Sequence, residues 1–169
     1  MPEPDEKTAL AILEGYRFDP QQIIAALLDI QEASGRSYVD PLWARLAARK
    51  MGVPVAAVYE ILTFYSMFSL EPRGRRLVEV CRSAPCLFTG ADDLLASLSG
   101  LLGVGAGETT PDGLFTLSVC GCVGRCAGSP VVKIGEEAFS VLNAAQAGEL
   151  LRSYREDDPA AREALRCRD

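Results

Sequence analysis

Two pairs of cysteines restrict the folds open to this 169-residue chain more than any other feature of its sequence. Cys81 and Cys86 are separated by four residues, and Cys122 and Cys126 are separated by three. Each loop is long enough to turn back and direct two sulfurs at one centre, and glycine and proline in and beside the loops reduce steric obstruction there. A centre with four sulfurs therefore requires two segments that are far apart in the sequence to meet in the fold.

The composition favours metal or redox chemistry at these cysteines. Residues 1–6 are acidic where an export signal would be basic and then apolar, and no stretch approaches the roughly 20 apolar residues of a membrane span. We therefore expect a soluble, cytoplasmic protein without direct membrane insertion, in a compartment that keeps structural thiols reduced. The net charge of −6 would repel phosphate backbones, so nucleic acid is not expected as a partner.

Histidine is absent from the sequence. Its absence excludes a Cys/His nucleophilic pair, mixed Cys/His zinc sites and Rieske-type ligation. What remains is a site built from cysteine alone, and we expect no catalytic residue on this chain.

The first part of the chain, residues 1–73, has the pattern of a small antiparallel helical unit. Apolar residues recur at helical spacing from Asp19 until a Ser-Gly stop at residues 34–35. A second helix is expected from Asp40, as N-cap, to Gly52, and a third over residues 54–68. The boundary with the next domain is placed in the basic run at residues 73–76, which is expected to be a solvated linker.

Residues 74–155 alternate short strands with helices, which is typical of an α/β layer. Strands are expected at residues 77–80, 114–119, 131–134 and 138–141, and helices at residues 89–102 and 144–154. The predicted order is β-α-β-β-β-α, and both cysteine pairs follow strand ends. The charged tail at residues 156–169 is expected to fray. The fold class is therefore α+β to α/β.

The cysteine spacing favours a 2Fe-2S cluster, because each iron of such a cluster takes two thiolates beside its bridging sulfides. Structural zinc is the main alternative, although zinc sites favour pairs close to C-x2-C, which this chain lacks. Cys120 precedes Cys122 by two residues, and alternation along the strand does not decide between them as ligand. Cys120 is expected to be a core thiol, and Cys167 in the tail is expected not to ligate.

Four motifs in order make the chain resemble the 24 kDa-type subunit of NADH:quinone oxidoreductase, a thioredoxin-like 2Fe-2S ferredoxin also found in NAD-reducing or electron-bifurcating hydrogenases and NAD-dependent formate dehydrogenases. The motifs are VYEILTFYSMF at residues 58–68, VEVC ending at Cys81 with Cys86 after it, GETTPDG at residues 107–113, and CVGRC from Cys122 to Cys126 followed by SPVV. The resemblance implies that Cys81, Cys86, Cys122 and Cys126 hold one 2Fe-2S cluster and that Cys120 is an extra thiol. Arg125, Cys120 and the tail depart from the family pattern.

The resemblance also implies a function and partners. The chain is expected to be an electron-transfer subunit of an NAD(H)-linked oxidoreductase, with FMN and NAD on a partner flavoprotein subunit and a further iron-sulfur subunit in the same complex. A zinc-stapled interaction module without a redox role is the alternative from a different class, and a free-standing ferredoxin is a third possibility. The aromatic stretch at residues 64–68 is expected either to pack within its own domain or to meet a partner.

Overall fold

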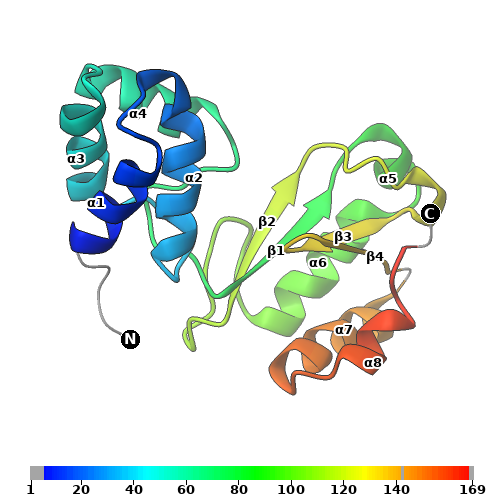
Figure 1. The fold of residues 1–169 in the computed structure, drawn as a ribbon. Helices are drawn as coiled ribbons and strands as arrows, with labels where there is room; N and C mark the ends of the chain where they lie inside the picture. Colours follow the sequence, from blue (N-terminus) through cyan, green and yellow to red (C-terminus); the bar gives the residue numbers. More distant parts are fainter. Residues whose placement is uncertain (1–5, 142, 168–169) are drawn as a thin grey trace. The chain divides into compact units, whose positions relative to one another are not determined.

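The computed structural model describes residues 6–141 and 143–167, and it divides the chain into two compact units, Met1–Arg75 and Arg76–Asp169 (Figure 1). The acidic opening residues 1–5 and the last two residues of the tail lie outside the described part. Within that part, no helix combines the length and the apolar character needed to cross a bilayer.

The first unit is helical throughout. It contains α1 (Glu6–Gly15), the 3-10 turn η1 (Pro20–Gln22), α2 (Ile23–Ala33), α3 (Pro41–Met51) and α4 (Val55–Phe64). Asp40 caps α3, because its side chain accepts a hydrogen bond from the N–H of Leu42, and Pro41 occupies the first helical position. Gly52 ends α3 in the left-handed conformation that favours glycine (φ 67°).

Helix α4 ends at Phe64 rather than near Phe68, where the apolar pattern placed its end. The reason is the side chain of Gln31 on α2, which donates to the carbonyl of Met67 and accepts from the N–H of Ser69, both at 2.9 Å. These bonds fix a turn that brings Phe68 into the core of the first unit, which also contains Trp43. The aromatic stretch is therefore divided, with Phe68 inside and Phe64 outside.

The second unit is a four-stranded mixed sheet in the order β2-β1-β3-β4. Its strands are β1 (Arg76–Cys81), β2 (Phe115–Cys120), β3 (Val131–Ile134) and β4 (Glu137–Ser140). Strands β1 and β2 are parallel, whereas β3 pairs antiparallel with both β1 and β4. Helices α6 (Ala91–Leu102) and α7 (Ala144–Arg155) pack together and cover one face of the sheet (Figure 1).

Helix α1 of the first unit was not among the helices expected from the sequence, and neither were two short helices of the second unit. Helix α5 (Ala84–Phe88) occupies the loop between the first two cysteines, and α8 (Pro159–Glu163) lies in the charged tail. The expectation that the tail frays is wrong for its described residues, because Arg166 forms an antiparallel bridge with Phe139 of β4. The tail is held because Leu165 is buried in the core of the second unit and the N–H of Ser140 donates to its carbonyl.

Candidate metal centre

The two cysteine loops begin at the same end of two neighbouring parallel strands. Cys81 is the last residue of β1, Cys120 is the last residue of β2, and the two are register partners in the sheet. The N–H of Arg82 continues the pairing by donating to the carbonyl of Cys120 at 3.1 Å. Because the carboxyl ends of parallel strands lie at one edge, the segments carrying Cys86 and Cys122 start side by side.

The two thiols of the first loop are buried. Cys86 lies within α5, and both Cys81 and Cys86 are almost completely buried. Arg82 forms an ion pair with Asp92 on the first turn of α6, at 2.9 Å. The positive charge of Arg82 is therefore balanced by a neighbouring carboxylate. Phe88, at the end of α5, is 91% exposed and places an apolar side chain next to this loop.

The second loop is open to solvent and has few internal bonds. Cys122 and Cys126 are both exposed, and Cys126 begins the 3-10 turn η2 (Cys126–Gly128). Gly124 has a positive φ of 78°, which directs its N–H to Sγ of Cys122 at 3.4 Å. This N–H is placed to stabilise negative charge on the sulfur.

The thiols of the first pair differ in acidity. Burial alone raises the pKa of Cys81, but hydrogen bonds from the backbone of Ser83, from the Cys86 thiol and from the backbone of Val123 outweigh it, and the net shift is downward. The pKa of Cys86 is raised to about 11, mainly by burial. A hydrogen bond from the backbone of Val131 lowers it, and the charge of Cys81 raises it further. Cys81 is thus the more acidic thiol of the pair, because hydrogen bonds from Ser83, Cys86 and Val123 favour its charged form.

The two loops are close enough to influence each other. A hydrogen bond with Cys122 and the charge of Cys122 raise the pKa of Cys126, and the charge of Cys81 adds to the effect. The charge of Cys126 in turn contributes to the raised pKa of Cys86, after burial and Cys81. The structure therefore brings the predicted ligand residues together as two pairs, Cys81 with Cys86 and Cys122 with Cys126, and the pairs interact through the charge of Cys126.

This arrangement fits the donor set of a 2Fe-2S cluster. Among the described residues, no three or more His, Cys, Asp or Glu side chains are grouped so as to hold a single metal ion. The thiols approach instead as Cys81 with Cys86 and Cys122 with Cys126. A cluster that takes two thiolates on each iron requires paired thiols and N–H donors near the sulfurs, and both are present.

The remaining two cysteines are partly buried. Cys120 is partly buried, and burial followed by the charges of Glu79 and Cys81 raises its pKa to about 11. Cys167, near the end of the described chain, is partly buried as well, and burial raises its pKa against the positive charge of Arg125. The backbone donors at Ser83, Val123 and Val131 were missed by sequence reasoning, because backbone groups leave no residue signature.

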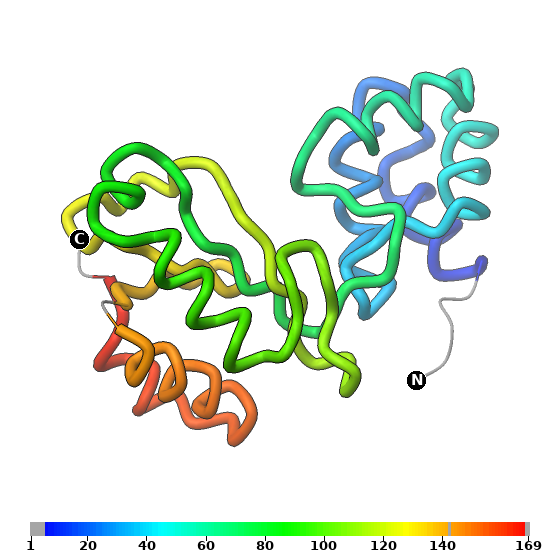
Figure 2. Tube along the Cα trace, turned by 180° about the vertical axis from the view of Figure 1, so that it is seen from behind, coloured from blue at the N-terminus to red at the C-terminus, as the bar shows by residue number. Residues whose placement is uncertain are grey.

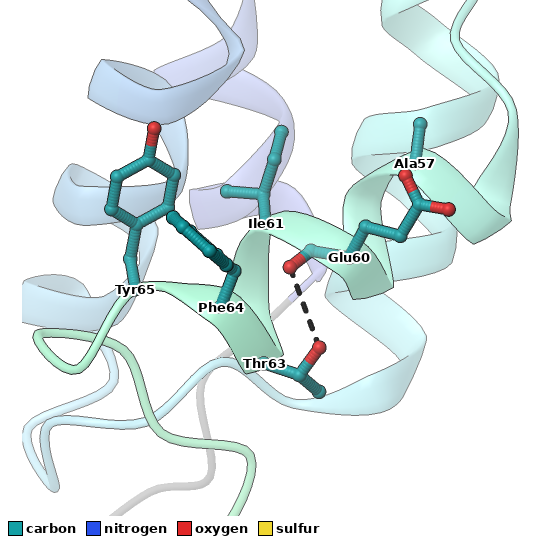
Figure 3. Close-up of a pocket in the computed structure, with 6 residues that line it drawn as sticks. All are labelled: Ala57, Glu60, Ile61, Thr63, Phe64 and Tyr65. Carbon is teal, nitrogen blue, oxygen red and sulfur yellow. Dashed lines mark hydrogen bonds between the residues drawn. The ribbon is translucent and has the colours of Figure 1, made fainter.

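A second surface lies on the first unit, at the end of α4. An open groove of about 700 Å³ is lined by six residues of this helix and its exit, which Figure 3 labels as Ala57, Glu60, Ile61, Thr63, Phe64 and Tyr65. The rings of Phe64 and Tyr65 meet edge to face with centroids 5.1 Å apart, and Phe64 is 80% exposed. Isolated apolar side chains are normal on a surface, but adjacent exposed rings beside a groove indicate a contact site.

The cysteine loops lie in a part of the chain that matches a known protein family. Residues 9–155 match the family described as thioredoxin-like 2Fe-2S ferredoxin. The chain belongs to this family. The match includes both cysteine loops and most of the helical first unit, and it ends before α8.

Relatives of known name belong to oxidoreductase complexes. The chain is 43% identical over 108 residues to an NADH-quinone oxidoreductase subunit of Rhizobium meliloti (strain 1021), covering 64% of each chain. It is 34% identical to the corresponding NADH-quinone oxidoreductase subunit of Rickettsia typhi over 79% of each chain. It is 29% identical to the NADP-reducing hydrogenase subunit HndA of Solidesulfovibrio fructosivorans, covering 91% of this chain and 89% of that one.

A solved structure shares the fold. The crystal structure of an NAD+-reducing NiFe-hydrogenase in the air-oxidized state superposes with a TM-score of 0.67 over 82% of this chain, at 19% identity. This chain spans 23% of the hydrogenase chain and 64% of the Rhizobium relative. The likeness to the hydrogenase establishes the thioredoxin-like fold alone.

Proposed function

We propose that this chain is an electron-transfer subunit of an NAD(H)-linked oxidoreductase complex and that it carries one 2Fe-2S cluster on Cys81, Cys86, Cys122 and Cys126. The observation that carries the proposal is the meeting of two paired-thiol loops at one end of β1 and β2, inside the part of the chain that matches the 2Fe-2S ferredoxin family. The names of the relatives, which are NADH-quinone oxidoreductase and hydrogenase subunits, support the kind of complex.

The bound cluster would accept and release single electrons, and the chain would set where and how easily this happens. Buried Cys81 and Cys86 hold one side of the site away from water. N–H groups directed at the sulfurs favour the more negative, reduced state. Exposed Cys122 and Cys126 mark the side at which an electron donor approaches most closely.

The flavin and the nicotinamide are proposed to lie on a partner flavoprotein subunit that binds FMN and NAD(H). The sequence has no G-x-G-x-x-G loop after a strand and no Walker loop, so no nucleotide site is proposed on this chain. The α4 groove with its exposed rings at Phe64 and Tyr65 is proposed as a docking surface for that subunit. A further iron-sulfur subunit would receive the electrons.

Electron paramagnetic resonance of the anaerobically purified, dithionite-reduced chain tests the proposal, together with iron and zinc analysis. We expect a rhombic S = 1/2 signal and two irons per chain. The Cys120→Ser variant should keep the signal and the iron, whereas the Cys122→Ser variant should lose them, because Cys122 is a proposed ligand and Cys120 is not. A colourless protein with one zinc and no signal would instead identify a zinc-stapled structural module.

A further inference from the structure

The C-terminal segment, residues 156–167, lies beyond the residues that match the family, yet it is folded onto the second unit. The carboxylate of Asp158 caps α8 by accepting from the N–H groups of Ala160 and Ala161. After α8 the chain runs antiparallel to β4. The N–H of Ser140 donates to the carbonyl of Leu165, and the N–H of Cys167 donates to the carbonyl of Ala138, both at 2.9 Å. The segment therefore adds an edge to the sheet.

Side chains fix this segment at three points. Leu165 is buried in the core of the second unit. The guanidinium of Arg162 lies over the ring of Tyr154, 4.5 Å from its centroid, and Arg166 forms an ion pair with Glu137 at 2.9 Å. Because these contacts combine apolar burial, a cation–π contact and backbone pairing, the segment is held even though its composition is charged.

The end of the segment reaches the exit of the second cysteine loop. A methyl group placed on Gly128, two residues after Cys126, would lie 3.1 Å from Sγ of Cys167 and 3.4 Å from Cβ of Ser140. Figure 2 shows the red C-terminal segment ending next to the yellow loop. A polar cavity of about 320 Å³ has Val123 and Arg125 of the loop on its wall together with Cys167.

The second loop needs outside support more than the first. Within it Cys122 and Cys126 hydrogen-bond each other, Gly124 donates to Cys122, and two turn bonds run from Gly128 to the carbonyl of Arg125 and from Ser129 to that of Cys126. Both of its thiols are exposed, whereas those of the first loop are buried. The close approach of Cys167 to Gly128 therefore limits where the chain can lie two residues after Cys126.

We infer that residues 156–167 form a strap that positions the second cysteine loop through the close approach of Cys167 to Gly128, and so controls how firmly the cluster is held and how easily it is reduced. Cys167 is in this view a positioning residue and not a ligand. The inference rests on the proposed function, because it requires a cluster on Cys122 and Cys126. The strap lies outside the residues that match the family.

Two substitutions, one that crowds the space between Gly128 and Cys167 and one that relieves the crowding, distinguish an effect of the strap on the cluster from a loss of overall stability. In Gly128→Ala the new methyl group crowds Sγ of Cys167. The backbone conformation of Gly128 lies outside the left-handed region, so the substitution adds no backbone strain. We expect iron release to a chelator to become about 10-fold faster, with shifted g values and midpoint potential. Adding Cys167→Ala removes the crowding sulfur and should return these values close to the wild type.

Gly148→Ala is the matched control, because a methyl group there, in α7, meets nothing within 4 Å. Thermal unfolding of all variants is measured beside the cluster properties. Identical iron release and g values in Gly128→Ala and Gly148→Ala would overturn the strap. So would a Gly128→Ala defect that Cys167→Ala fails to relieve, since the crowding would then come from Ser140 of β4. A wild-type chain without iron would refute the proposed function itself.

Discussion

Cys81 and Cys120 are register partners at the ends of β1 and β2, yet the pKa values of their thiols are shifted in opposite directions from the ordinary value. Burial raises the pKa of both, but Cys81 receives hydrogen bonds from Ser83, Cys86 and Val123 that bring its pKa below the ordinary value. For Cys120 the charge of Lys133 opposes the effect of burial, but burial is the larger effect and the pKa rises to about 11. Neighbouring positions in the sheet therefore shift the pKa of their thiols in opposite directions.

This difference predicts a pH dependence for alkylation of Cys120. Because the thiolate is the nucleophile, a raised pKa leaves little reactive form near neutral pH, and the rate should rise about tenfold for each pH unit up to about pH 11. Iodoacetamide labelling of the metal-free chain, followed by peptide mass spectrometry, measures it. Exposed Cys122 serves as the internal comparison and should react first at neutral pH. Equal rates for the two thiols near pH 7 would contradict the assignment.

The divided aromatic stretch gives a matched pair of variants. Phe68 is 4% exposed and packs in the core, so Phe68→Ala should destabilise the first unit by about 3–5 kcal/mol. Phe64 is 80% exposed, so Phe64→Ala should change stability by less than about 0.5 kcal/mol and should weaken co-purification with the flavoprotein subunit. Fluorescence of the single tryptophan, Trp43, follows unfolding. If Phe64→Ala co-purifies as well as the wild type, this ring is not part of the docking surface.

The helices, strands and cysteine pairs were largely predictable because they depend on local patterns. Capping by Asp40 and the stop at Gly52 are local signals that the structure confirms. The early end of α4 was not predictable, because it depends on Gln31, which is distant in the sequence. The fold of the tail was missed for the same reason, since Leu165 and Arg166 are held by β4. Local patterns thus identify elements, and tertiary contacts decide where they end.

The candidate site shows the same division. The spacing of the cysteines predicted the two loops, but it did not decide between Cys120 and Cys122. It also gave no indication of α5, which buries Cys86. Among the family motifs, GETTPDG has a structural explanation: Asp112 accepts hydrogen bonds from the hydroxyl of Thr110 and the N–H of Leu114, which fixes the entry into β2. The motif therefore positions the strand that leads to the second loop.

Gln31 is expected to control the shape of the surface beside α4. Replacing it with leucine leaves the carbonyl of Met67 and the N–H of Ser69 without their partner, which should cost about 1–3 kcal/mol. Gln31→Glu keeps the acceptor for Ser69 but sets a carboxylate oxygen against the carbonyl of Met67 at a buried position, so it should also destabilise the turn. Urea unfolding followed by Trp43 fluorescence measures the loss, and visible absorbance of the cluster reports the second unit separately. A Gln31→Leu variant as stable as the wild type would mean that the turn is held by other contacts.

The ion pair between Arg82 and Asp92 is expected to set the charge next to the first loop. Arg82 follows Cys81 directly, and Asp92 balances it at 2.9 Å. In Asp92→Asn the positive charge is no longer compensated, and because a positive charge stabilises the more negative reduced cluster, the midpoint potential should rise. At a separation of roughly 10 Å in water-like surroundings, one unit charge corresponds to a shift on the order of 20 mV.

Redox titration of wild type and variants by electron paramagnetic resonance measures the sign of this shift. Arg82→Gln should lower the potential by a similar amount, and the double variant should lie near the wild type, because the two charges are then both absent. Added salt should reduce every shift, since both side chains are about half exposed. If Asp92→Asn and Arg82→Gln move the potential in the same direction, the effect comes from a change in the loop itself and not from charge. That result would assign to this ion pair the role of holding β1 and α6 together around Cys81.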